Sequence, residues 1–227
     1  MAYYNEVIRS PTHYMTYILI LLNAVIFIFQ QFNDTITDLF AMVPALILSG
    51  QNLFTLITSM FLHGDFLHLL INMYFLYIFG SVVEHEMHPF IYLSVYILAG
   101  VVGSFGHILI SYTLYSVVNP WSPSIPTIGA SGAIFGIMAA YAYLLPRRPV
   151  GVYGYGGRSV AIWNMIFLYF AIEVFQLFFS FGSNIAHGAH VFGFIGGYVI
   201  ALVYRSLRVQ SNQKKAGAEY DPYEHYV

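Results

Sequence analysis

The chain has 227 residues, of which 59% are hydrophobic and only 8% are charged, and its mean hydropathy is +0.69. Soluble domains carry about 25% charged residues, so this composition disfavours a soluble protein and favours a polytopic membrane protein. The chain has no cysteine, which excludes disulfide bonds and thiolate metal sites within it. The net charge of −2 is uninformative as a total, whereas the positions of the charges are informative.

Uncharged runs predict the membrane helices. Residues 1–13 form a short polar head that lacks the pattern of a secretory signal peptide. The first uncharged run, 14–32, is long enough to cross the roughly 30 Å hydrocarbon core as a helix. In the connection at 33–65, the apolar pieces 39–48 and 53–62 are too short to span, so we expect short helices at the interface or within the bundle. The remaining predicted spans are 66–83, 90–115, 128–146, 160–181 and 186–204.

These runs predict an all-α membrane protein, a bundle of six transmembrane helices with a long outer connection between spans one and two. We expect a cytoplasmic segment at 1–13, a membrane domain at 14–206 and a loose cytoplasmic tail at 207–227. With six spans, all eight basic residues fall on one side of the membrane, which the positive-inside rule makes the cytoplasmic side. We therefore expect a protein of the cell membrane with both termini in the cytoplasm. The basic residues are Arg9, Arg147, Arg148, Arg158, Arg205, Arg208, Lys214 and Lys215.

Four polar side chains share one depth in this topology. Spans two, four and six begin at the outer surface. His68 and Asn72 on span two, Ser131 on span four and His190 on span six then lie within about two helical turns of that surface. Polar side chains at such a depth rarely face lipid and tend to converge on one another or on water. We expect the four to form one site.

The residue types in this layer suit nucleophilic catalysis. A serine hydroxyl attacks a carbonyl only when a base takes its proton, and a neutral imidazole is the usual base. Ser131 near a helix start offers backbone N–H groups to an oxyanion, and His68 and Asn72, on one helix face, could add side-chain donors. Since no carboxylate is obviously placed to orient His190, we expect a Ser-His dyad and not a triad.

Glycines on two predicted spans suggest how the serine and the histidine meet. Gly132 and Gly136 on span four, and Gly193 and Gly197 on span six, form faces of small residues spaced four apart. Such faces let two helices approach closely. The approach would bring the hydroxyl of span four within hydrogen-bond reach of the imidazole of span six.

Three short motifs, in this order on spans two, four and six, resemble the rhomboid intramembrane serine proteases. The resemblance covers about residues 14–206. It implies Ser131 as nucleophile, His190 as general base, and His68, Asn72 and the Ser131 backbone amide as oxyanion donors. It also implies protein substrates with transmembrane helices that enter sideways from the lipid bilayer past spans two and five, and cleavage near the outer surface. The motifs are His-x4-His-x3-Asn at 63–72, Gly-Ala-Ser-Gly at 129–132 and Ala-His-x-x-Gly at 189–193.

Supporting residues are expected around this site. We assign His63 to a structural hydrogen bond, not to chemistry. Gly129, two residues before Ser131, is assigned to support of the site together with Gly132, Gly193 and Gly197.

A metal site is the main alternative use of the nine histidines. The spacings His85-x2-His88 and His187-x2-His190 invite it, but the two pairs fall at opposite ends of the helices. No cysteine or well-placed carboxylate completes a shell, so no metal and no other cofactor is expected. Glu173, the one charged residue inside a predicted span, remains a functional candidate without an assigned role.

Two further functions stay open. A catalytically inactive rhomboid-like protein would bind membrane segments without cutting them, although such proteins usually lack the serine or the histidine. A small transporter or channel is disfavoured because the polar groups cluster at one end of the helices and not at the midplane. We expect no nucleic-acid partner, and the sequence leaves the oligomeric state open.

Overall fold

A computed structural model describes residues 14–146, 162–180 and 185–218, with side chains described as far as 211. The predicted N-terminal segment lies outside these residues, as do the ends of the fifth predicted span. The basic residues Arg9, Arg147, Arg148 and Arg158 also lie outside them.

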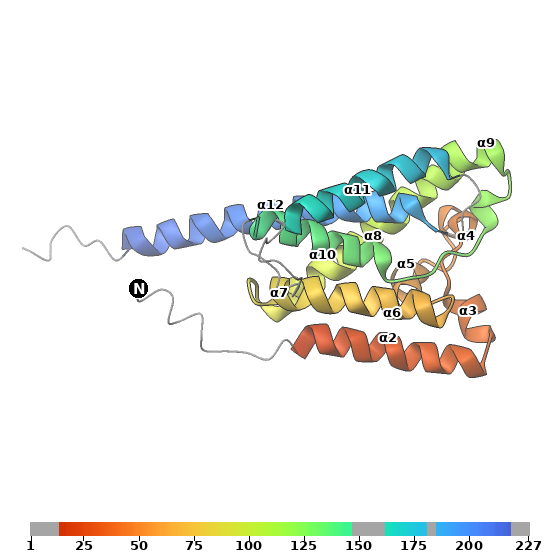
Figure 1. The fold of residues 1–227 in the computed structure, drawn as a ribbon, viewed down its shortest axis with the longest axis horizontal. Helices are drawn as coiled ribbons and strands as arrows, with labels where there is room; N and C mark the ends of the chain where they lie inside the picture. The colour runs from red at the N-terminus through yellow and green to blue at the C-terminus, as the bar shows by residue number, and fades with distance from the viewer. Residues whose placement is uncertain (1–13, 147–161, 181–184, 219–227) are drawn as a thin grey trace, which may run out of the picture.

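Helices and their connections make up the described residues, with one isolated β-bridge between Met42 and Thr127. Figure 1 shows the long helices running side by side along one direction, with the short helices α3, α4, α5 and α9 gathered at one end. The elements are α2 (Tyr14–Phe32), α3 (Thr35–Phe40), α4 (Pro44–Leu48), α5 (Thr55–Thr58), η1 (Ser59–Phe61), α6 (Phe66–Phe75), η2 (Leu76–Gly80), α7 (Ser81–Glu84), α8 (Pro89–Ile110), η3 (Ser111–Tyr115), α9 (Ser116–Val118), η4 (Ser122–Ser124), α10 (Ser131–Leu144), α11 (Ile162–Phe179) and α12 (His187–Ala218).

Five helical stretches among the described residues are long and apolar enough to cross a membrane. Two of them are composite, because the short π-helical segments η2 and η3 continue α6 into α7 and α8 into α9. The stretches are Tyr14–Phe32, Phe66–Glu84, Pro89–Val118, Ile162–Phe179 and His187–Ser211.

The fourth predicted span, 128–146, differs from expectation. It forms the 14-residue helix α10, which at 1.5 Å per residue is about 21 Å long and shorter than the roughly 30 Å hydrocarbon core. Every residue at 132–142 is buried, so this helix is surrounded by protein and not by lipid. The described structure therefore has five helices of spanning length and one short central helix.

The end of the last predicted span also differs. Helix α12 does not stop at Tyr204 but continues to Ala218, and Figure 1 shows it running past the other long helices. Residues 209–218, expected to be a loose tail, are thus helical. Gln, Lys and Ala in this stretch are good helix formers, which lets the helix continue beyond its apolar part.

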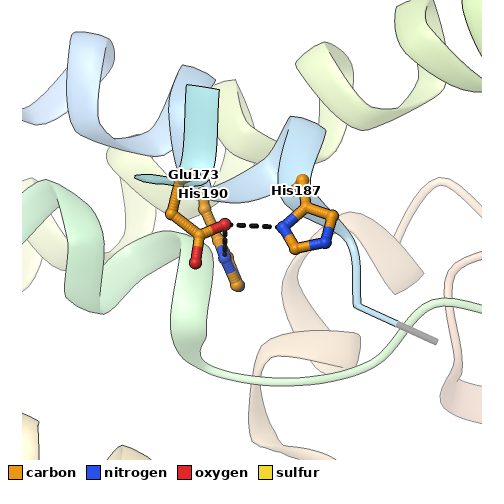
Figure 2. A group of neighbouring side chains, drawn as sticks. All are labelled: Glu173, His187 and His190. Carbon is orange, nitrogen blue, oxygen red and sulfur yellow. Dashed lines mark hydrogen bonds and ion pairs between the residues drawn. The ribbon is translucent and has the colours of Figure 1, made fainter. Parts of the chain in front are cut away.

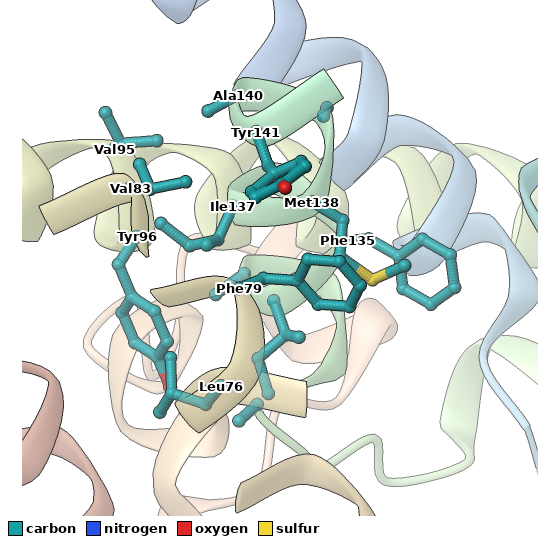
Figure 3. Close-up of a cluster of buried hydrophobic side chains, with 14 of the residues drawn as sticks. Leu76, Phe79, Val83, Val95, Tyr96, Phe135, Ile137, Met138, Ala140 and Tyr141 are labelled. Carbon is teal, nitrogen blue, oxygen red and sulfur yellow. The ribbon is translucent and has the colours of Figure 1, made fainter. Parts of the chain in front are cut away.

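Helix α10 lies at the centre of the packing and contacts α6, α8, α11 and α12. Figure 3 shows its side chains interleaved with those of η2, α7 and α8. Lipid tails are as apolar as these side chains, so close van der Waals packing, more than exclusion from water, holds such helices together. Central members of this core are Leu76, Phe79, Val83, Val95, Tyr96, Phe135, Ile137, Met138, Ala140 and Tyr141.

The connection at 33–65 folds into the short helices α3, α4, α5 and η1 and holds the segment that precedes α10. Met42 and Thr127 exchange two backbone hydrogen bonds, of 3.1 and 2.7 Å, and the Gly129 N–H donates to the Ser59 carbonyl at 2.9 Å. These bonds fix the backbone just before Ser131.

Candidate active site

Ser131 is the first residue of α10, and the turn before it depends on glycine. Gly129 has a φ of +127°, in a region that side-chain-bearing residues rarely adopt. A Cβ atom there would also lie only 2.9 Å from Cε1 and 3.0 Å from Nε2 of His68. Gly129 therefore lets the chain turn into the helix directly in front of the His68 ring.

Helices α10 and α12 approach as closely as their glycines predicted. A Cβ atom on Gly193 would overlap the carbonyl of Gly132, and one on Gly197 would overlap the carbonyl of Gly136. With no side chain between the two backbones, residues on facing turns come within hydrogen-bond distance.

The close approach brings Ser131 and His190 together. Ser131 Oγ lies 2.7 Å from His190 Nε2. One turn further along α10, the ring of Phe135 stacks on the His190 ring with centroids 4.6 Å apart and planes 15° apart. The imidazole is thus held on one face by an aromatic ring and at its edge by the hydroxyl.

A carboxylate also contacts His190, so the expectation that none is placed to orient it is wrong. Glu173 on α11 lies with Oε2 2.8 Å from His190 Nδ1 and 2.7 Å from His187 Nδ1 (Figure 2). All three side chains are buried. The carboxylate comes from inside a membrane helix, from the charged residue that the sequence analysis left without an assigned role.

His68 reaches the serine loop in a defined orientation. Its Nδ1 accepts a hydrogen bond from the Gly64 N–H at 3.4 Å, while its own backbone N–H donates to Asp65 Oδ1 at 2.8 Å. In the neutral ring the proton then sits on Nε2, the nitrogen that faces Gly129. His68 therefore presents an N–H donor on the side of the loop that leads into Ser131.

Asn72 is buried but directed within its own helix, where its Nδ2 donates to the His68 carbonyl at 2.9 Å. The amide group carries two hydrogens, and this bond uses one of them. His63 makes its hydrogen bonds through its backbone: its N–H donates to Gln30 Oε1 at 3.0 Å, and its carbonyl accepts from Gln30 Nε2 at 3.3 Å. The His63 ring packs against the His68 ring, with centroids 5.1 Å apart.

Comparison with known families shows the family of the chain. The model of the Rhomboid domain matches residues 50–207, more than two thirds of the chain and all the site residues described above. The chain belongs to the rhomboid family. Together with the five apolar helices of spanning length among the described residues, this makes it an integral membrane protein. Among curated proteins, none matches the chain.

A pocket opens beside Ser131 in this rhomboid. Small residues of α8, of α10 and of 186–189 at the start of α12 form much of its wall, and the connection at 33–65 and residues 127–129 form the rest. Its lining residues are Met42, Ser59, Met60, Gly100, Ser104, Thr127, Ile128, Gly129, Ser131, Gly132, Ala133, Ala186 and Ala189.

The metal alternative also changes, because a carboxylate does join one histidine pair. Glu173, His187 and His190 each present one ligand atom, and these atoms lie within 4.8 Å of one another. The argument that no well-placed carboxylate completes a shell is therefore wrong for this pair. Glu173 and His187 are the site residues that sequence analysis left without a role; the signals were the single charge inside a span and a histidine three residues before His190.

Proposed function

We propose that this rhomboid is an intramembrane serine endopeptidase that cleaves transmembrane segments of membrane proteins near the outer membrane surface. The observation that carries the proposal is the 2.7 Å contact between Ser131 Oγ and His190 Nε2. A neutral imidazole at this distance can take the hydroxyl proton as the oxygen attacks a carbonyl. Ser131 is the nucleophile and His190 the general base.

The reaction then follows acyl transfer. Ser131 Oγ bonds to the scissile carbonyl carbon, and the C–N bond breaks as His190 passes the proton it has taken to the leaving amine. Water then attacks the acyl carbon with His190 again as base; the bond from that carbon to Oγ breaks, a carboxyl group is released, and His190 returns the proton to Ser131. The oxyanion of each tetrahedral intermediate accepts hydrogen bonds from the Ser131 backbone N–H, from His68 Nε2–H and from the Asn72 amide.

The surroundings of Ser131 suggest which substrates fit. The pocket beside it has many small residues in its wall, which suits a small side chain next to the scissile bond. Phe75 of α6 stacks on Tyr169 of α11 with centroids 6.0 Å apart, and both residues are half-buried. Separation of these two rings would open a sideways path from the bilayer between α6 and α11, the second and fifth predicted spans.

The topology belongs to the same proposal. Arg205 and Arg208 lie on α12 well beyond its His190 end, and Arg208 Nη1 donates to the Glu86 carbonyl at 3.2 Å. By the positive-inside rule this end is cytoplasmic, so the Ser131 end faces outward and both termini are cytoplasmic. The protein then resides in the cell membrane and acts at its outer face.

An inactive relative that only binds membrane segments is the competing function. The hydrogen bond between Ser131 and His190 argues against it, since a binding protein needs neither group. Peptide-bond cleavage distinguishes the two functions, whereas binding of a membrane segment is expected of both.

The test is cleavage in liposomes. Purified protein is reconstituted with a single-span substrate labelled at both ends, and the fragments are identified by mass spectrometry. Wild type should cut within or beside the span, while Ser131→Ala and His190→Ala should not. Ser94→Ala is the matched control, since Ser94 is exposed on α8 and donates to the Phe90 carbonyl in its own helix. A folded wild type that leaves several substrates intact, or a Ser131→Ala variant that still cuts, would refute the proposal.

A further inference from the structure

We propose that Glu173 is a positioning residue that, together with His187, fixes the ring orientation and the tautomer of His190. This inference rests on the proposed function, because it assigns a role to groups behind the proposed general base. It replaces the expected Ser-His dyad with a chain of hydrogen bonds from Ser131 through His190 to Glu173.

The geometry makes Glu173 Oε2 the point at which two rings are held. His187 and His190 stand three residues apart on the first turn of α12 and so project from one face of that helix. Both direct Nδ1 at the same oxygen, at 2.7 and 2.8 Å (Figure 2). Because Glu173 comes from α11, these bonds also fix how the two helices sit around the ring of His190.

The chemistry of the acceptor sets the tautomer. An ionised carboxylate has no proton to give, so each Nδ1 that it contacts must carry the hydrogen. In neutral His190 the other nitrogen, Nε2, then keeps its lone pair. That nitrogen lies 2.7 Å from Ser131 Oγ, where a base must be unprotonated to take the hydroxyl proton.

His187 supplies the second hydrogen bond to the buried oxygen. Glu173 is buried, with 3% of its surface exposed. A buried carboxylate is costly to keep ionised unless hydrogen-bond donors satisfy its oxygens. The Nδ1–H of His187 is such a donor, and its hydrogen bond of 2.7 Å restrains the oxygen. His187 therefore acts on His190 through Glu173.

A bound metal ion is the competing use of the same three groups, and the distances disfavour it. Two ligands on one tetrahedral Zn²⁺ at about 2.0–2.1 Å lie about 3.3 Å apart. The two N···O distances here are 2.7 and 2.8 Å, which are hydrogen-bond lengths. A metal on His190 Nδ1 would also place the ring proton on Nε2 and remove the base from Ser131.

The negative charge of Glu173 also acts during the reaction. When His190 takes the serine proton it becomes an imidazolium, and a buried carboxylate at 2.8 Å stabilises that cation. Other titratable groups interact with the cluster electrostatically, from α11 itself and from neighbouring helices. They are His68 on α6, His107 on α8, Tyr115 in η3 and Tyr169 on α11.

The experiment measures cleavage kinetics in detergent against pH for matched variants. Glu173→Gln keeps a hydrogen-bond acceptor and removes the charge, whereas Glu173→Met removes both. We expect kcat to fall about 10-fold and about 100-fold respectively, with KM within about twofold of wild type. In Glu173→Gln the loss of activity on acidification should move to lower pH, because the imidazolium has lost its counter-charge. Glu86→Gln, the same chemical change far from the site, should behave as wild type.

A double variant tests the link through Glu173. His187→Gln alone should lower kcat. The same change in the Glu173→Met background should lower kcat almost no further, because the hydrogen bonds that link His187 to His190 through Glu173 are already absent. This arm keeps the test decisive even where one Glu173 variant fails to fold, because His187→Gln alone must still lower kcat and leave KM unchanged.

Three results would overturn the inference. One is wild-type kcat and an unshifted pH profile in both Glu173→Gln and His187→Gln; another is full additivity in the double variant. The third is wild-type activity that a chelator abolishes and Zn²⁺ restores, which would assign the cluster to a metal. In each case activity that still depends on Ser131 leaves the proposed function standing, whereas cleavage by Ser131→Ala would remove it separately.

Discussion

The ring of Phe135 lies nearly parallel to the ring of His190, 15° apart with centroids separated by 4.6 Å. The two residues come from α10 and α12, and Phe135 is itself buried. The stack covers one face of the imidazole, so it limits rotation of the ring away from Ser131. Phe135→Ala should lower kcat about 10-fold with little change in KM, as measured by cleavage in detergent.

Phe135→Tyr provides the control for this prediction, since it keeps the aromatic face. It should retain most of the activity. Its thermal midpoint shows whether the added hydroxyl fits at this buried position. Equal kcat values for the alanine variant and wild type would show that the stack does not restrain His190.

Close contact between Gly193 and the Gly132 carbonyl predicts a strong response to one methyl group. Gly193→Ala forces α12 away from α10, which costs about 1–3 kcal/mol in overpacking and separates Ser131 from His190. Both the thermal midpoint and the activity per folded molecule should fall. Gly100→Ala is the milder comparison, because its closest clash is with the flexible end of the Met60 side chain. Full activity in a folded Gly193→Ala protein would contradict the close approach.

His63 predicts a pH dependence of stability. Burial, with a smaller contribution from nearby His68, lowers the pKa of His63 from 6.5 to about 3. The unfolded chain therefore binds a proton between these values that the folded protein does not. This contribution to the free energy of unfolding is fully present above pH 6.5 and is lost as pH falls toward 3, by up to about 1.4 kcal/mol per pH unit.

Thermal midpoints measured above and below pH 6.5 test this. His63→Gln should have a shallower acid dependence than wild type, whereas His88→Gln, at an exposed position, should keep the wild-type dependence. Identical dependence in wild type and His63→Gln would assign the acid sensitivity to other groups.

Glu84 caps the start of helix α2, at the end of the bundle opposite Ser131. Its carboxylate accepts hydrogen bonds from the Met15 N–H (2.9 Å), the Thr16 N–H (2.9 Å) and the Thr16 hydroxyl (2.7 Å). Hydrogen bonds to a charged group contribute about 1.5–3 kcal/mol each, so Glu84→Ala should lower the thermal midpoint clearly. Activity per folded molecule should stay near wild type, because the residue is remote from Ser131. An unchanged midpoint would contradict the capping role.

Much of the site follows from the sequence because the residues that carry it lie at helix starts. Ser131, His68 and His190 stand in the first turns of α10, α6 and α12, where the span boundaries alone fix their depth. The glycine spacing on α10 and α12 likewise predicts their contact. Such features depend on local sequence, so they can be read without a structure.

Other features depend on packing that no local pattern records. Glu173 meets His190 only because of the rotation of α11 about its axis, which the mostly apolar sequence of that helix does not reveal. The short length of α10 reflects its position among other helices, where it has no need to reach both membrane surfaces. The direction of the Asn72 amide is a rotamer choice, and spacing shows only that it shares a face with His68.

Covalent labelling of Ser131 tests the central claim most directly. Purified protein in detergent is treated with a fluorophosphonate probe, and the modified residue is located by mass spectrometry. We predict one adduct on Ser131, absent in Ser131→Ala and strongly reduced in His190→Ala, with Ser94→Ala labelled as wild type. A folded wild type with no adduct at Ser131, or labelling of Ser131 that persists unchanged in His190→Ala, would contradict a serine nucleophile activated by this histidine.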